Sequence, residues 1–302
     1  MKNTSKKMKT IWDMETGDPD DYLTLLFLIG YPQIDLIGVN VTPGSWDQVS
    51  VVRQAFKRFG VQNVPIGAFL TEDDPKSRVS GWHYKTVGLD NTRTPPDMEG
   101  TALLDELYAE DVTLITGGPL KNVGKFLREF TARKLGRIVV QGGFAGEGVV
   151  PSGFQLEKFS GKAHVPTYNL NGDPKSALLV VDSPYFSEKK FVSKNVCHGV
   201  YFDDEIKRAM FSKLHKISKV RKHENLMLQR YLNTFVFNCK EGKKLHDPLA
   251  AACAIDTSVG TWAKVDLWRH KGHWGSSLNP ESDLEIIIDY NRERFIEVLT
   301  GG

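Results

Sequence analysis

Five acidic side chains lie within nine positions near the N-terminus, at Asp13, Glu15, Asp18, Asp20 and Asp21 in the stretch WDMETGDPDD. Carboxylates held this close raise one another's pKa values unless a cation lies between them. Carboxylate and carbonyl oxygens are the ligands that Ca²⁺ and Mg²⁺ prefer, whereas zinc prefers His and Cys. Capping of the helix that follows explains one or two of these acids, but not five. The stretch is therefore a candidate metal site.

A second candidate group lies far downstream, in the stretch LHDPLAAACAID at residues 245–256. His246 and Asp247 directly precede a proline and an apolar segment, and on their own they are typical of a helix start. A functional role becomes the better interpretation if the fold turns them toward the acidic stretch.

The elements that must position these groups alternate between strand-like and helix-like patterns. Predicted strands cover 9–14, 34–42, 64–69, 112–116 and 137–141, and predicted helices cover 20–29, 45–59, 101–108 and 122–133. Further along, the pattern predicts a helix after Asp173, a strand near 190–196, a helical region over 204–237, a helix from Asp247, and strands at 263–269 and 283–290. Apolar strands separated by helices indicate an α/β fold, with a mainly parallel sheet and helices on both faces.

Ligands of such sheets bind beyond the carboxyl ends of the strands. The acidic stretch follows the first predicted strand, TPGS the second, TGGPL the fourth and GGFAGEG the fifth, so four candidate segments meet at one edge. Two long irregular segments, 70–99 and 144–165, interrupt the alternation, and loops of that length are often functional. Because no linker or repeat divides the chain, we expect a single domain over 1–302.

Composition excludes several classes of protein. A formal charge of +2, from 39 basic and 37 acidic residues, argues against nucleic-acid binding, and the basic run 213–222 has the period of a solvated helix face. Three isolated cysteines argue against a disulfide scaffold and fit a reducing compartment. The chain has neither a secretory signal pattern nor an apolar run of roughly 18 residues. We therefore expect a cytoplasmic protein that does not bind membranes.

Five short motifs, in order along the chain, resemble those of the inosine–uridine-preferring nucleoside hydrolases. They are DMETGDPDD at 13–21, GPLKN at 118–122, IVVQGG at 138–143, NLNGDP from Asn169, and HDPLA at 246–250. The resemblance covers nearly the whole chain. It implies a Rossmann-like nucleoside hydrolase fold, a small-molecule nucleoside substrate, a tightly bound Ca²⁺ and a homodimer or homotetramer.

The resemblance also implies roles for individual residues. Asp21 matches a bidentate calcium ligand, Asp247 a second ligand, and the carbonyl of Gly117 a backbone ligand. Asp20 and Asn169 match ribose contacts, and His246 matches the group near the leaving base. The long loop that contains Trp82 and His83 matches a segment bordering the substrate; these aromatic side chains either stack on a base or pack the loop onto the protein.

Three departures from the family pattern fall within the expected site. Glu15 stands where the family has a second Asp, and the spacing to Asp20 is one residue longer. Glu15 is the candidate general base and metal ligand, with Asp13 as its rival for the base. Thr167 and Ser45 replace a Glu and an Asn at expected ribose contacts.

These features predict an enzyme that hydrolyses the N-glycosidic bond of a ribonucleoside or a modified nucleoside. A calcium-bound water, activated by a carboxylate, would attack the sugar. The altered contacts leave open a non-catalytic nucleoside or nucleotide sensor on the same fold. A dinucleotide-binding oxidoreductase is disfavoured, because no GxGxxG follows the first strand and five acids would repel a pyrophosphate.

Overall fold

The computed structural model describes residues 6–70, 72, 78–129, 133–219 and 225–302. These residues form an eleven-stranded sheet with the order β4-β3-β2-β1-β5-β6-β8-β11-β9-β10-β7. The strands are β1 Met8–Met14, β2 Ile34–Val41, β3 Ile66–Ala68, β4 Met98–Glu99, β5 Val112–Thr116, β6 Ile138–Gln141, β7 His164–Val165, β8 Lys189–Val192, β9 Gly260–His270, β10 His273–Leu278 and β11 Leu284–Tyr290. The strands from β4 to β11 in this order are parallel, and β9, β10 and β7 add an antiparallel edge.

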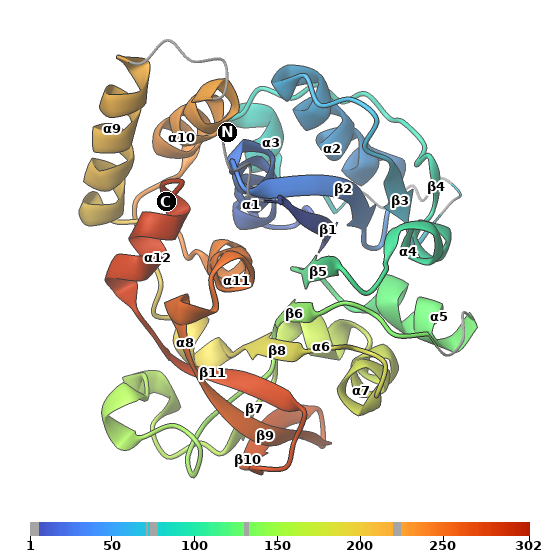
Figure 1. The fold of residues 1–302 in the computed structure, drawn as a ribbon, viewed down its shortest axis with the longest axis vertical. Coiled ribbons are helices and arrows are strands. Elements are labelled where there is room, and N and C mark those ends of the chain that lie inside the picture. Colours follow the sequence, from blue (N-terminus) through green and yellow to red (C-terminus); the bar gives the residue numbers. More distant parts are fainter. Residues whose placement is uncertain (1–5, 71, 73–77, 130–132, 220–224) are drawn as a thin grey trace.

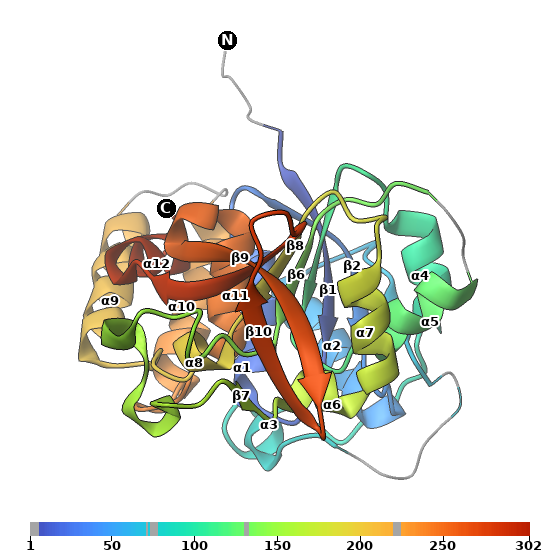
Figure 2. The ribbon, with the colours of Figure 1, turned by 90° about the horizontal axis from the view of Figure 1, so that it is seen from below.

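Helices cover both faces of the sheet (Figure 1). They are α1 Pro19–Gly30, α2 Trp46–Phe59, α3 Gly81–Lys85, α4 Gly100–Leu107, α5 Lys121–Glu129, α6 Tyr168–Gly172, α7 Pro174–Asp182, α8 Lys194–Cys197, α9 Asp204–Ser218, α10 Leu226–Asn238, α11 His246–Ile255 and α12 Arg292–Leu299. Figure 2 shows α9 to α12 on one side of the strands and α4, α5 and α7 on the other. The mainly parallel α/β fold predicted from the sequence is confirmed.

The first strand is buried on both faces, as a central parallel strand requires. Ile11 belongs to the apolar core beneath α4, α5 and α7, whereas its neighbours Trp12 and Met14 belong to the core beneath α1, α2, α10 and α11. With both faces fixed by packing, the polar end of β1 can project only beyond the edge of the sheet. The acidic stretch lies there.

The helix α11 runs through the protein interior rather than over its surface. Its residues 250–254, AAACA, are fully buried, and their small side chains let the helix lie close to β5 and β6. The first residues of this helix, His246 and Asp247, therefore reach the same edge of the sheet as the end of β1.

The basic run 213–222 agrees with its interpretation as far as the structure describes it. In α9 the side chains of Ile206, Met210 and Leu214 are buried, and the lysines face outward; residues 220–222 lie outside the described part. Among the described residues, no helix combines the length and the hydropathy needed to cross a bilayer.

Candidate active site

Asp20 joins the first turn of α1 to the first turn of α11. Its Oδ2 accepts hydrogen bonds from the backbone N–H groups of His246, at 3.1 Å, and Asp247, at 3.4 Å. Its Oδ1 accepts a hydrogen bond from Lys243 Nζ at 2.9 Å. The first N–H groups of a helix lack partners within the helix and carry partial positive charge, so a carboxylate fits there. Asp20 thereby holds Asp247 beside Asp21.

Asp20, Asp21 and Asp247 each place a carboxylate oxygen within 4.8 Å of the other two. All three side chains are buried. Burial, and then the charge of Asp247, raise the pKa of Asp21 well above its usual range; burial and the charge of Asp20 do the same for the pKa of Asp247. A buried group of oxygen donors that resists ionisation fits a hard divalent cation, which would remove this repulsion.

Gly117 closes the acidic group from the side of β5. A Cβ atom at this position would lie 2.4 Å from the Trp12 ring and 2.9 Å from Asp247 Oδ1, so only glycine fits. Its carbonyl oxygen accepts a hydrogen bond from Asn169 Nδ2 at 2.9 Å, and Asn169 also donates to the side chain of Gln141 at 2.7 Å. Asn169 thus ties the loop after β5 to the end of β6.

The two candidate bases, Asp13 and Glu15, have different surroundings. The Oδ1 atom of Asp13 accepts hydrogen bonds from Thr42, at 3.3 Å, and Asn122, at 3.5 Å, while its Oδ2 is buried with no hydrogen-bond partner among the described residues. Burial raises the pKa of Asp13 to about 7. Burial and the charge of Asp20 likewise raise the pKa of Glu15 to about 7. The Glu15 backbone N–H donates to Asp21 Oδ1 at 3.0 Å, which fixes the chain but leaves the Glu15 carboxylate toward the cavities.

His246 is the first residue of α11, next to Asp247, and it lines the smaller of two cavities at the site. Its ring stacks on that of His198 with 4.8 Å between centroids, and its Nε2 atom is buried without a partner in the described structure. Burial, followed by the charge of Lys243, lowers the pKa of His246 to about 4, so the imidazole is neutral near pH 7. A neutral imidazole can donate one hydrogen bond to a ligand in the cavity.

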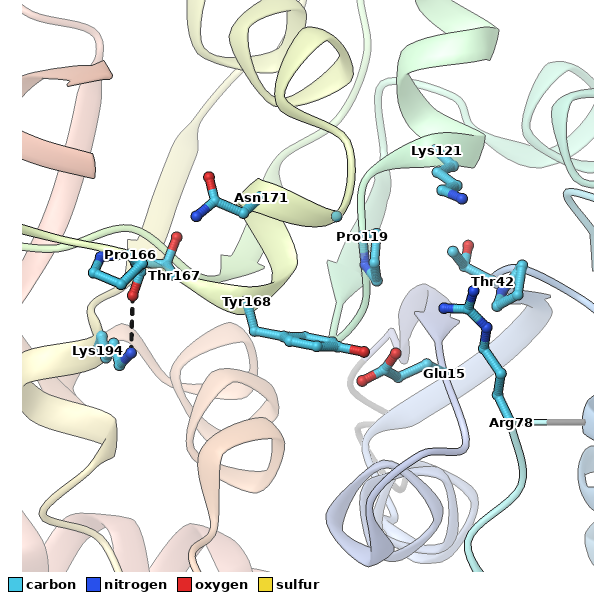
Figure 3. Close-up of a pocket in the computed structure, with 12 residues that line it drawn as sticks. Glu15, Thr42, Arg78, Pro119, Lys121, Pro166, Thr167, Tyr168, Asn171 and Lys194 are labelled. Atoms are coloured by element: carbon cyan, nitrogen blue, oxygen red, sulfur yellow. Dashed lines mark hydrogen bonds between the residues drawn. The ribbon is translucent and has the colours of Figure 1, made fainter. Parts of the chain in front are cut away.

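Two adjoining cavities give access to these groups. The smaller, of about 320 Å³, is lined by the acidic residues, His246 and Asn169. The larger, of about 500 Å³, is lined by Thr167, Tyr168, Arg78, Lys121 and Lys194 among others. Glu15 and Tyr168 line both, so the two cavities adjoin at these side chains. Figure 3 shows the Tyr168 hydroxyl pointing toward Glu15, with Arg78 and Lys121 on the side of Thr42 and Lys194 at the opposite end.

Ser45, Trp82 and His83 were expected near the substrate. None of the three is among the described residues that line either cavity. Ser45 is fully buried at the start of α2, where its backbone N–H and its hydroxyl bond to Gln48 Oε1. Trp82 donates its indole N–H to the carbonyl of Asn238, and His83 is fully buried with Nδ1 3.0 Å from Ser80 O. Helix capping explains Ser45, and packing of the loop onto α1 and α10 explains the two aromatic residues.

Several residues of the site were not predicted from the sequence. Gln141 and Tyr168 line the smaller cavity, Lys243 bonds Asp18 at 2.6 Å as well as Asp20, and Arg78, Lys121 and Lys194 surround the larger cavity. Gln141 could have been found, because it ends the strand in IVVQGG. Lys121 could have been noticed as well, because it lies in GPLKN, whereas Arg78, Lys194 and Lys243 lie in no motif and carry no comparable signal in a sequence with 39 lysines and arginines.

The fold matches that of solved nucleoside hydrolases. A purine-preferring ribonucleoside hydrolase from Gardnerella vaginalis superposes with a TM-score of 0.64 at 17% identity, over 97% of both chains. The inosine-uridine preferring nucleoside hydrolase from Bacillus anthracis superposes with a TM-score of 0.65 at 18% identity, over 97% of this chain and 98% of that one. At these identities the likeness establishes the fold class alone: an α/β protein of the nucleoside hydrolase type.

The sequence comparison is more specific. The model of the inosine-uridine preferring nucleoside hydrolase family matches residues 10–297, and the chain belongs to that family. The protein is thus a hydrolase acting on N-glycosyl compounds, in a metal-dependent family whose substrates are small nucleosides. A protein of Aquifex aeolicus, described only as uncharacterized, is 29% identical over 295 residues, which cover 95% of this chain and 96% of that one.

Proposed function

We propose that the protein hydrolyses the N-glycosidic bond of a ribonucleoside or a modified nucleoside to the free base and the ribose, with Ca²⁺ as its resident ion. The observation that carries this proposal is the buried group Asp20, Asp21 and Asp247, which opens on a cavity also lined by Glu15 and His246. Asp21, Asp247, the carbonyl of Gly117 and Glu15 would hold the ion. When bound there, Ca²⁺ would supply positive charge that favours ionisation of a water and binding of a ribose diol.

Side chains of the protein would perform the other steps of the reaction. Glu15 faces the cavity with a pKa raised to about 7, which suits a group that must accept a proton from the attacking water near neutral pH. Asn169 and Asp20 are fixed by their own hydrogen bonds, so they offer rigid contacts to the ribose. Neutral His246 donates a hydrogen bond to the departing base, on which negative charge develops as the C1′–N bond breaks.

The test is release of ribose from a panel of purine and pyrimidine nucleosides in the presence of calcium. We expect base and ribose in equal amounts from at least one of them. Glu15→Gln should remove this activity, whereas Glu106→Gln, on the exposed face of α4, should retain it. Binding of nucleosides without any cleavage, by a calcium-loaded protein, would support the non-catalytic sensor instead.

A further inference from the structure

The larger cavity is lined by three cationic side chains, of which Arg78 also interacts electrostatically with the Glu15 carboxylate. Arg78, Lys121 and Lys194 line it, and no carboxylate forms an ion pair with any of the three within the described residues. The ammonium group of Lys121 lies 5.5 Å from the centre of the Phe69 ring, and that of Lys194 donates to the carbonyl of Pro166 at 2.8 Å. Neither contact supplies a counter-charge. Three such cations around one cavity favour an anionic ligand.

A neutral hydrogen-bonding group faces the same cavity. Thr167 is 3% exposed, and its hydroxyl has no hydrogen-bond partner among the residues that the structure describes. A buried hydroxyl without a partner costs free energy, and a ligand oxygen would satisfy it. Thr167 lies at the end of the cavity near Lys194, away from Arg78 and Lys121 (Figure 3), so its hydroxyl marks a second polar position in the cavity and is no part of the contact to those two cations.

The position of the cavity identifies the part of the substrate that would enter it. The two cavities meet at Glu15 and Tyr168, and His246 lines only the smaller one. A ribose held at Asp20, Asp21 and Asp247, with its base toward His246, directs its C5′ end past Glu15 into the larger cavity. Arg78 lies between Glu15 and Thr42 there, where it screens an incoming anion from the carboxylate (Figure 3).

We infer that the substrate carries a phosphate on C5′ of its ribose, bound by Arg78 and Lys121, so that the protein is a hydrolase of nucleoside 5′-monophosphates. This inference rests on the proposed function. In the reaction, a water oxygen bonds to C1′ as the C1′–N bond breaks. The bonding electron pair leaves with the base, which ends with one water proton, and the products are the free base and ribose 5-phosphate. The phosphate ester itself remains intact.

A base in the larger cavity would account for the observations less well. Tyr168 and the prolines at 43, 119 and 166 could contact a flat ring, but a neutral base would leave the cations without a partner. A phosphate meets them with charge-assisted hydrogen bonds, and a guanidinium can bind it through two parallel contacts.

The experiment compares inosine with inosine 5′-monophosphate, and uridine with uridine 5′-monophosphate, in calcium-loaded protein. We expect kcat/KM for the monophosphates to be roughly 10- to 100-fold higher, the effect of one or two charge-assisted hydrogen bonds. Equal or better cleavage of the unphosphorylated nucleosides would overturn the inference and leave the proposed function standing. If no compound of either kind is cleaved, both fail.

Variants test the assignment of the cations. Lys121→Met and Arg78→Met should each lower the ratio of monophosphate to nucleoside kcat/KM by roughly 10-fold or more, mainly through KM. Lys121→Arg should restore most of that ratio. Lys175→Met removes an exposed charge on α7, outside both cavities, and should leave the ratio unchanged. Inorganic phosphate should compete with the monophosphate; competition without any preference for the monophosphate would show a site for free phosphate and contradict the inference.

Discussion

Asp13 and Glu15 lie two residues apart and have similarly raised pKa values, but their contacts differ. Asp13 is held by Thr42 and Asn122 within the protein, whereas Glu15 faces the substrate side. A proton acceptor in hydrolysis must reach the water that attacks the sugar, and position comes before pKa in that choice. Glu15 meets the condition, and Asp13 fits the part of a group that fixes the end of β1.

Replacing each carboxylate with its amide tests this division. Glu15→Gln should lower kcat by roughly 10²- to 10⁴-fold, because it keeps the shape but cannot accept the proton. Asp13→Asn should retain more activity but lose about 1–3 kcal/mol of stability, because an amide cannot match the present set of buried donors and acceptors. Steady-state kinetics, thermal unfolding and calcium content of both variants decide the matter. An active Glu15→Gln beside an inactive, calcium-loaded Asp13→Asn would reverse the roles.

At the scale of elements, the attachment of α11 to α1 determines whether the site forms. Asp20 accepts the N–H groups of α11, and Lys243, just before that helix, contacts both Asp18 and Asp20. Lys243 is 17% exposed, and the charges of Asp20 and Asp18 outweigh its burial and raise its pKa, so it remains charged across the neutral range. Among the described residues, no other lysine or arginine forms an ion pair with Asp18 or Asp20.

Removing the charge of Lys243 should weaken the attachment of α11 to α1. Lys243→Met leaves Asp18 and Asp20 without their shared partner, and we expect a loss of about 1–3 kcal/mol in calcium-free protein. Added calcium should reduce the loss, since the ion supplies positive charge nearby. Lys240→Met, at an exposed residue shortly before, is the matched control and should unfold like the wild type. Thermal unfolding with and without calcium measures the effect. An unchanged thermal unfolding midpoint for Lys243→Met would show that Asp20 alone holds α11 against α1.

The central elements could be predicted from the sequence because burial on both faces leaves a strong pattern. The strand 112–116 was predicted with the bounds it has, and α2 begins within a residue of its prediction. The edge strands β7 and β10 were not predicted, since His164–Val165 is too short and HWGSSL is too polar to show a continuous apolar run. Short helices such as α3 and α8 lack the length over which a helical period can be recognised.

Residues of the site were likewise predictable where they lie in a local sequence motif, and not where only tertiary contacts bring them to the cavity. Asp21, Asp247 and Gly117 lie in motifs, and the fold brings them together. Ser45 occupies a motif position as well, but local capping with Gln48 takes its side chain away from the cavity. Arg78 comes from an irregular segment and reaches the cavity through the path of the chain, which no local pattern encodes. Residues whose role depends on long loops are therefore the ones that sequence alone misses.

At the scale of the whole molecule, three distant parts of the chain meet at one edge of the sheet. Residues near 15, 117 and 247 arrive there from the ends of β1 and β5 and the start of α11 (Figure 1). The carboxylates in this arrangement repel one another when they are ionised. Bringing them together therefore destabilises the folded state unless a cation binds between them. The same feature that prepares the site for catalysis makes the stability of the fold depend on its ligand.

Removal of calcium should therefore destabilise the protein as well as inactivate it. Protein purified without chelator should contain about one calcium per chain by elemental analysis. A ligand present at 100 to 1,000 times its dissociation constant stabilises the folded state by about 2.7–4.1 kcal/mol, so chelation should lower Tm by on the order of 5–10 °C. Calcium should restore both Tm and activity, whereas zinc, which prefers nitrogen and sulfur ligands, should not.

The variant Asp247→Asn distinguishes stabilisation by calcium bound at the site from a general effect of salt on stability. It keeps the size of the side chain but removes one of the repelling charges, so its calcium-free form should unfold at or above the midpoint of calcium-free wild type. Because it also loses a ligand, calcium should raise its Tm by much less than it raises that of the wild type. A wild-type protein that contains zinc, or that is active and equally stable without any metal, would contradict the assignment of these buried carboxylates to calcium.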